Sequence, residues 1–117
     1  VIAICGAPMS VTLDGAPIAL WRSHRVKSGS VLELGAARGP GLRTYVAVAG
    51  GFDVPPYLGS RATFTLGQFG GHAGRTLRVG DVLPLSPARG TPKPQTLPAS
   101  LVPACTDHWE IGVLYGP

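Results

Sequence analysis

Glycine and proline interrupt this chain so often that little room is left for a long helix. Seventeen glycines and 12 prolines occur among the 117 residues, and both residue types weaken a helix interior. No segment repeats apolar residues at positions i, i+3, i+4 and i+7 over three helical turns. Short apolar runs bounded by turn residues are instead typical of strands. The sequence therefore predicts a mainly all-β fold that is rich in turns.

The expected strands follow one another with tight turns between them. Asp14-Gly15 stands between two short apolar runs, a pattern typical of a two-residue hairpin turn. Residues 45–49 are apolar on both sides of a strand, which predicts that the strand expected at residues 42–49 is covered on both faces. One helical turn is expected near residues 55–58. Further strands are expected at residues 1–4, 11–13, 18–20, 21–26, 31–34, 63–66, 77–79 and 82–85.

The composition changes near residue 86, and this change predicts the domain organisation. Five prolines and few bulky side chains occur between residues 86 and 103, which is typical of an extended linker. We expect a barrel-like β subdomain over residues 1–86, a Pro-rich linker over residues 87–106, and the first strand of a following subdomain over residues 107–117. The chain opens on Val1–Ile4, which already resembles a strand, so we expect a fragment of a longer protein.

Charge and cysteine content exclude several classes of function. The net charge is +4, but the eight arginines are scattered and aromatic residues make up 7%, which speaks against a nucleic-acid surface. No apolar run approaches the length of a membrane span. His24 and His108 have no partner at the spacing of a metal site, so no metal is expected. Cys5 and Cys105 are interpreted as reduced thiols, with a disulfide as the alternative.

Several glycine-rich blocks carry a resemblance to a known family. They are residues 47–55 (Ala-Val-Ala-Gly-Gly-Phe-Asp-Val-Pro), 58–63 (Leu-Gly-Ser-Arg-Ala-Thr), 69–75 (Phe-Gly-Gly-His-Ala-Gly-Arg), 80–83 and 111–117. In this order they resemble the carboxyltransferase region of biotin-dependent urea carboxylase and urea amidolyase. This allophanate hydrolase subunit 2 family also includes the C component of 5-oxoprolinase. The resemblance implies cyclophilin-like β-barrel subdomains, and residues 57–67 favour the urea carboxylase branch.

The activity that the resemblance implies is transfer of a carboxyl group from carboxybiotin to urea, giving allophanate. Such a site must stabilise negative charge on an oxygen and remove a proton from the acceptor nitrogen. Arg61 and His72 are the catalytic candidates, as a fixed cation and a proton relay. The candidates for substrate binding are Ser60, Gly70, Gly71 and Arg75. Gly70-Gly71 would offer main-chain N–H groups at close range.

Each candidate also has a structural interpretation. Gly70-Gly71 would serve only to permit positive φ angles, and Arg61 would pair with Asp53 or with a segment outside the chain. His72 would be an ordinary loop histidine. Asp53 itself is interpreted as a turn residue, whose side chain binds its own backbone. The sequence alone leaves both interpretations of each candidate open.

The resemblance also implies cofactors and partners. Biotin would arrive on a separate domain or subunit, and ATP would bind only at a partner active site. Expected partners are a biotin carrier, a biotin carboxylase and a companion barrel similar to allophanate hydrolase subunit 1, with a cytoplasmic location. Two alternatives stay open: a 5-oxoprolinase component that hydrolyses an amide with ATP and without biotin, or a non-catalytic partner-binding module. The fragment alone is expected to be inactive and to self-associate through unpaired strand edges.

Overall fold

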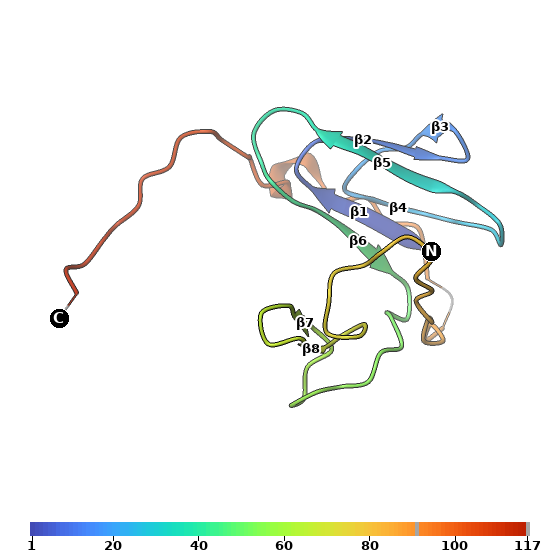
Figure 1. Cartoon of the computed structure of the whole chain (residues 1–117). Coiled ribbons are helices and arrows are strands. Elements are labelled where there is room, and N and C mark those ends of the chain that lie inside the picture. The colour runs from blue at the N-terminus through green and yellow to red at the C-terminus, as the bar shows by residue number, and fades with distance from the viewer. Residues whose placement is uncertain (91, 117) are drawn as a thin grey trace. The chain divides into compact units, whose positions relative to one another are not determined.

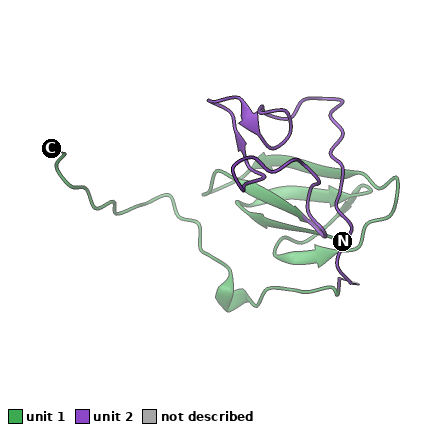
Figure 2. Ribbon diagram, turned by 90° about the horizontal axis from the view of Figure 1, so that it is seen from below, with its two compact units in different colours: residues 1–47, 93–117 green, residues 48–92 purple. Residues whose placement is uncertain are grey.

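The computed structural model describes residues 1–90 and 92–116, and in these residues the chain is built from eight short strands and one 3-10 turn. Two compact units share them (Figure 2). Unit 1 comprises residues 1–47 and 93–117, and unit 2 comprises residues 48–92. The elements are β1 (Ile2–Gly6), β2 (Met9–Leu13), β3 (Ala16–Pro17), β4 (Arg22–His24), β5 (Leu32–Ala37), β6 (Thr44–Val48), β7 (Thr63–Phe64), β8 (Phe69–Gly70) and η1 (Ala99–Leu101).

The strands of unit 1 form two small sheets, which are labelled in Figure 1. One has the order β4-β1-β6 and the other the order β3-β2-β5. The predicted turn at Asp14-Gly15 joins β2 to β3, with Thr12 opposite Pro17. β5 pairs antiparallel with β2 and places Leu32 opposite Leu13. The sheet positions therefore confirm the hairpin, although its second strand begins at Ala16 and not at residue 18 as predicted.

The core of unit 1 is small and centres on β1. Ile4 is fully buried, and Ile2, Ala7 and Val11 are each less than a tenth exposed. The main-chain oxygen of Ile4 also accepts the N–H of Trp21 at 2.7 Å. Because Ile2 and Ile4 alternate with half-exposed residues, they share one face of the strand.

The burial predicted for residues 42–49 is wrong. In β6 the residues alternate between half-buried and exposed, and the side chain of Tyr45 is 58% exposed. The exposed residues Tyr45 and Ala47 share one face of the strand, and this face has no covering layer among the described residues. The apolar run identified a strand correctly, but it did not show how many of its faces were covered.

The Pro-rich segment is bound to unit 1 over part of its length. The N–H of Leu97 donates to the main-chain oxygen of Trp21 at 2.8 Å, and the N–H of Ser23 donates to Gln95 at 2.8 Å. Arg22 and Thr96 form an antiparallel bridge, and η1 follows at Ala99–Leu101. This part of the predicted linker therefore extends the edge next to β4.

The predicted strand after residue 107 does not form in the described residues. Residues 107–116 carry no helix or strand, and they run away from the sheets of unit 1 (Figure 1). Their apolar side chains are exposed, including Trp109 at 71% and Leu114 at 97%. The domain division expected at residues 86 and 106 stays a prediction. That residues 107–117 open a following subdomain stays a prediction.

Unit 2 consists mostly of loops around one short hairpin. β7 pairs with β8, which places Thr63 opposite Gly70 and Phe64 opposite Phe69. The ring of Phe69 lies 5.2 Å from that of Phe64 and 4.7 Å from that of Tyr57, centre to centre. The predicted strands at residues 77–79 and 82–85 are wrong, because these residues form only the isolated bridge between Leu85 and Phe52. The predicted helical turn at residues 55–58 is a non-helical turn closed by Tyr57 and Ser60.

Candidate functional site

Four of the six predicted site residues line one hollow in unit 2. This hollow, here called the histidine hollow, has a volume of about 340 Å³ and is lined by Arg61, Gly71, His72 and Arg75. The remaining lining residues were not predicted, and they are Phe52, Val54, Thr63, Thr65, Thr76, Leu77 and Leu83. Ser60 and Gly70 each lie one residue before a lining residue. The structure therefore groups the two catalytic candidates with two of the four binding candidates.

Arg61 is tied to the loop before it through one nitrogen. Its Nη1 donates to the main-chain oxygen of Val54 at 2.7 Å and to that of Phe52 at 3.3 Å. The same atom lies 3.3 Å from Oδ1 of Asp53. The structural interpretation of Arg61 as a partner of Asp53 is therefore confirmed. The side chain is still 51% exposed, so Nε and Nη2 keep donors for a ligand.

Arg75, which also lines the histidine hollow, forms a bidentate ion pair with Asp81. Nη1 of Arg75 donates to Oδ2 of Asp81 and Nη2 donates to Oδ1, each at 2.8 Å. Nη1 also donates to the main-chain oxygen of Thr76 at 2.8 Å. Both terminal nitrogens of Arg75 are thus used within the protein. Its clearest role is to hold the segment from Arg75 to Asp81 closed, and its contact with a substrate stays a prediction.

The environment of Asp81 favours its ionised form. Hydrogen bonds from the Arg75 guanidinium and from the N–H of Arg78 hold the pKa of Asp81 well below its ordinary value of 3.8, with a smaller contribution from the charges of Arg75 and His72. The hydrogen bonds to Asp81 in turn raise the pKa of Arg75. The pair therefore stays ionised throughout the neutral pH range.

His72 is oriented by the same carboxylate. Its Nε2 lies 3.5 Å from Oδ1 of Asp81, and its side chain is 26% exposed. A carboxylate at this distance restricts the rotation of the ring. His72 is therefore more than an isolated loop histidine, because Arg75 fixes Asp81 and Asp81 faces His72. Sequence reasoning missed Asp81, although its place in a Gly-Asp turn and the arginine six residues before it were visible.

The Gly70-Gly71 pair has a packing role that needs no ligand. Both residues have positive φ angles, 72° and 51°, which other residues rarely adopt. A side chain at Gly70 would collide with the main-chain oxygen of Ala62, and one at Gly71 would collide with Thr63. The structural interpretation of the pair is therefore confirmed. Main-chain donation from these glycines to a ligand stays a prediction.

Ser60 belongs to the turn that precedes β7. Its Oγ accepts the N–H of Ala62 at 3.1 Å, and its main-chain groups exchange hydrogen bonds with Tyr57. These bonds shape the turn that presents Arg61. A direct contact between Ser60 and a substrate stays a prediction.

The Asp81 ion pair gives the protein a testable pH dependence. A carboxylate whose pKa is lower in the folded state stabilises the protein above its unfolded pKa, and this contribution is lost as the pH falls through the folded pKa. We therefore expect the free energy of unfolding to fall more steeply between about pH 5 and pH 2 in the wild type than in Asp81→Asn. Guanidinium chloride titrations at several pH values would measure both slopes.

The matched control for this experiment is Asp107→Asn. The Asp107 side chain is 82% exposed and lies 3.6 Å from the similarly exposed His108. Its replacement should leave the pH slope of the wild type almost unchanged. Equal slopes for the wild type and Asp81→Asn would show that the ion pair does not persist in solution.

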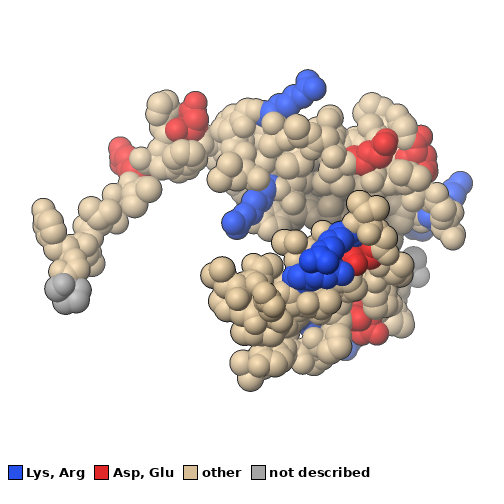
Figure 3. All heavy atoms as spheres, viewed as in Figure 1, with Lys and Arg blue, Asp and Glu red and all other residues tan. Residues whose placement is uncertain are grey.

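Metal-binding clusters, membrane helices and basic patches are the remaining kinds of site that side chains could form. No group of three His, Cys, Asp or Glu residues is placed to hold a metal ion in residues 1–90 and 92–116. In the part of the chain that the structure describes, no helix has both the length and the hydrophobicity of a membrane crossing. On the face in Figure 3, most Lys and Arg side chains stand apart from one another, and the blue group at the centre lies against acidic atoms.

Comparison with known proteins decides the family. The profile of the carboxyltransferase domain, subdomain A and B, matches residues 1–117. The chain belongs to this carboxyltransferase family. The family predicted from the glycine-rich blocks is thereby confirmed.

Individual relatives of this carboxyltransferase chain agree with the profile. Urea amidolyase of Saccharomyces cerevisiae is 47% identical over 124 residues, which cover 100% of the chain and 7% of that protein. The crystal structure of Kluyveromyces lactis urea carboxylase superposes on the chain with a TM-score of 0.82 at 41% identity. The matched region covers 90% of the chain and 10% of that structure. The C component of Escherichia coli 5-oxoprolinase is 40% identical over 89 residues, which are 74% of the chain and 28% of that protein.

These matches show that the carboxyltransferase chain corresponds to a small part of each relative's length. The chain spans 7% of the yeast urea amidolyase and 28% of the bacterial 5-oxoprolinase component. It corresponds to one piece of enzymes that are much longer. The all-β class and the assignment to the carboxyltransferase region are confirmed, and the urea enzymes match more of the chain than the 5-oxoprolinase component does.

Proposed function

We propose that this chain is part of a carboxyltransferase that moves a carboxyl group from carboxybiotin to urea. The observation that carries the proposal is the histidine hollow, where Arg61 and His72 lie together in a chain of the carboxyltransferase family. Similarity to urea amidolyase over the whole chain supports urea as the acceptor. When bound, biotin would supply the activated carboxyl group from a separate carrier domain.

The histidine hollow fits a small, flat and neutral guest. Its volume of about 340 Å³ is at the lower end of ligand pockets. Phe52, Val54, Leu77 and Leu83 give it apolar walls, while Thr63 and Thr65 contribute hydroxyl groups. Apolar walls keep water away from the reacting atoms, and hydroxyls both donate to an oxygen and accept from an amide N–H.

Arg61 and His72 would have different roles in the reaction. Arg61 keeps Nε and Nη2 for an oxygen that becomes negative during the transfer, because only Nη1 is used by the residue 52–54 loop. His72, oriented by Asp81, would take the proton from the acceptor nitrogen. Gly71 and Arg75 shape the wall next to His72, and Ser60 and Gly70 set the turns that hold Arg61 and Gly71. All six predicted residues therefore have a role in the proposed site.

The proposal includes the partners that such a reaction requires. A biotin carrier would deliver the carboxyl group, a biotin carboxylase would load it with ATP at its own site, and a companion barrel would complete the acceptor site. The proposal also places the assembly in the cytoplasm. The full protein, and not this chain alone, would carry the activity.

A biotin test separates the proposal from the 5-oxoprolinase alternative, which the Escherichia coli relative favours. In the intact protein that contains this chain, we expect urea to stimulate ATP hydrolysis and avidin to abolish the stimulation. The measurement is phosphate release with urea or 5-oxoproline as the added substrate. Turnover that depends on 5-oxoproline and resists avidin would support the alternative and overturn the proposal.

A non-catalytic role as a partner-binding module makes a different prediction. If the chain has this role, we expect no turnover with either substrate. We also expect the Arg61→Ala and His72→Ala variants to keep binding the partner. Co-purification of the partner with each variant would measure this. The histidine hollow would then be a structural feature of the loop.

A further inference from the structure

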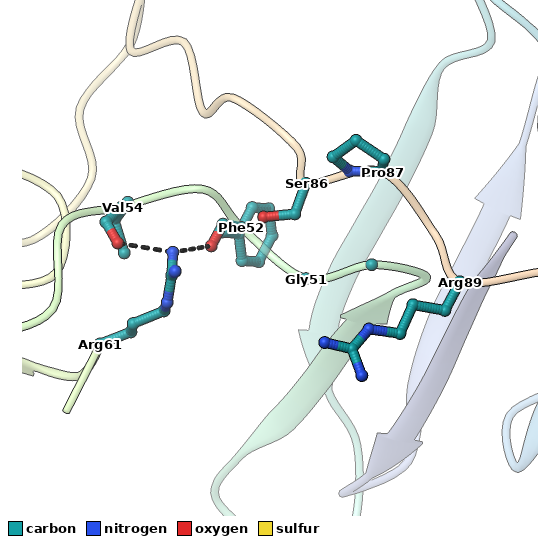
Figure 4. A pocket seen from close by; sticks show the side chains of 8 residues that line it. Gly51, Phe52, Val54, Arg61, Ser86, Pro87 and Arg89 are labelled. Carbon is teal, nitrogen blue, oxygen red and sulfur yellow. Dashed lines mark hydrogen bonds between the residues drawn. The ribbon is translucent and has the colours of Figure 1, made fainter. Parts of the chain in front are cut away.

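A second hollow in unit 2 brings two arginines together. This arginine hollow has a volume of about 650 Å³, and Arg61 and Arg89 both line it. Gly51 and Ser86 lie between them along its wall, as the close view shows (Figure 4). In the sequence, Arg89 is one of eight scattered arginines. The structure places Arg89 at a cavity that is also lined by Arg61, whose Nη1 is held by the residue 52–54 loop.

The two walls of the arginine hollow are held together through their main chains. The N–H of Ser86 donates to the oxygen of Gly51 at 2.9 Å, and the N–H of Asp53 donates to Pro84 at 2.8 Å. Gly50 has a φ of 88°, and a side chain there would collide with the main-chain oxygen of Ser86. Only glycine allows this close approach without strain. The residues that carry Arg61 and Arg89 are therefore fixed relative to each other.

The two guanidinium groups differ in how they are used. Nη1 of Arg61 is bound by the residue 52–54 loop. Within residues 1–90 and 92–116, the Arg89 side chain makes no hydrogen bond or ion pair. Its guanidinium extends from the segment after Pro87 back toward the Gly51 loop (Figure 4). Arg89 thus presents a complete set of donors at the cavity.

The charge at the arginine hollow is unbalanced. Two guanidinium groups face it, and the carboxylate of Asp53 lies 3.3 Å from Nη1 of Arg61. About one positive charge is left without a partner among the described residues. The guanidinium fork matches the two oxygens of a carboxylate, and a monoanion would balance the remaining charge.

We propose that the arginine hollow binds a monoanionic carboxylate, with Arg89 as the binding fork and Arg61 as the second cation. This site adjoins the histidine hollow, with which it shares Phe52 and Val54 as well as Arg61, but it does not depend on carboxyl transfer. Arg61 lines both hollows, with Nη1 committed to the loop. A bound carboxylate would therefore contact Arg61, which also lines the proposed acceptor site.

The proposal is tested by protection of arginine against phenylglyoxal, a reagent that modifies accessible guanidinium groups. The intact protein would be labelled in acetate, benzoate, phosphate or chloride at equal ionic strength, and each arginine would be followed by peptide mass spectrometry. We expect acetate and benzoate to slow the labelling of Arg89 several-fold relative to chloride. Arg78 serves as the internal control, because it is exposed and lies outside the arginine hollow.

The outcomes of this labelling experiment either support or overturn the proposal. Equal slowing of Arg89 and Arg78 would overturn it, as would stronger protection by phosphate than by the two carboxylates. Arg61→Gln should reduce the protection of Arg89, while Arg78→Gln should leave it unchanged. The wild-type comparison holds even where a variant fails to fold. Because labelling is measured without turnover, its result is independent of whether the proposed carboxyltransferase function is correct.

Discussion

Replacing Arg61 by alanine is expected to lower urea-dependent turnover of the intact protein by at least about 100-fold, the usual effect of removing one fixed donor from a developing negative charge. The expectation rests on geometry. One guanidinium nitrogen is held by the residue 52–54 loop, so the other donors stay in place without a further cost in side-chain entropy. Steady-state rates of urea-dependent phosphate release would measure the loss.

The matched control is Arg78→Ala. Its side chain is exposed and lies outside the histidine hollow, and Asp81 is bound by its main-chain N–H, which the substitution keeps. We expect turnover close to that of the wild type. Added guanidinium ion, below concentrations that unfold the protein, should restore part of the activity of Arg61→Ala. A full wild-type rate in Arg61→Ala, or an equal loss in Arg78→Ala, would contradict the assigned role.

Local turn chemistry was the most predictable part of the fold. Asp14 takes a φ of 52° in the β2–β3 turn, a conformation that Asp tolerates and most residues avoid. Its side chain accepts the N–H of Val31 at 2.7 Å and the hydroxyl of Ser30 at 3.0 Å. The turn is therefore encoded by two adjacent residues, which the sequence displays directly.

Pairing across long distances was much less predictable. The apolar run that contains β6 indicated a strand, but whether Tyr45 is covered depends on residues elsewhere in the chain. The segment that contains Leu97 pairs beside β4, although its prolines suggested an extended linker. The pattern at residues 77–85 resembled a hairpin, yet Asp81 there binds Arg75 and Arg78 and closes a loop. A side chain that satisfies main-chain donors competes with strand pairing.

The candidate site was likewise predicted only where its residues lie close together in the sequence. Arg61, Gly71, His72 and Arg75 were found from their place in one glycine-rich segment, because that segment folds back on itself within unit 2. Thr63 and Thr65 were missed, since nothing in their local sequence marks them as neighbours of His72. Asp81 was missed because its Gly-Asp turn was interpreted as part of a hairpin. Arg89 was missed for a further reason. Its place at the same hollow as Arg61 depends on the packing of Gly50 against Ser86, which only the structure reveals.

Replacing Ile4 by alanine is expected to destabilise the chain by about 2–5 kcal/mol, the range for truncation of a fully buried isoleucine. Ile4 is 0% exposed, and the buried apolar side chains around it in unit 1 are few. A loss of this size is a large fraction of the stability of a typical small domain, which is about 5–15 kcal/mol. Unfolding of the 117-residue chain in guanidinium chloride, followed by circular dichroism, would measure it.

The control for this prediction is Leu42→Ala, because Leu42 is 90% exposed. Removing its side chain should change the free energy of unfolding by no more than about 0.5 kcal/mol, as for most surface positions. The effect of Ile4→Ala should extend through the sheet, because β1 is its central strand, with β4 on one side and β6 on the other. Since β6 leads directly into residues 48–92, loss of the anchor at Ile4 should also lower activity in the intact protein without any contact with the site. Equal stability losses for the two variants would show that the buried face of β1 does not form the core of unit 1.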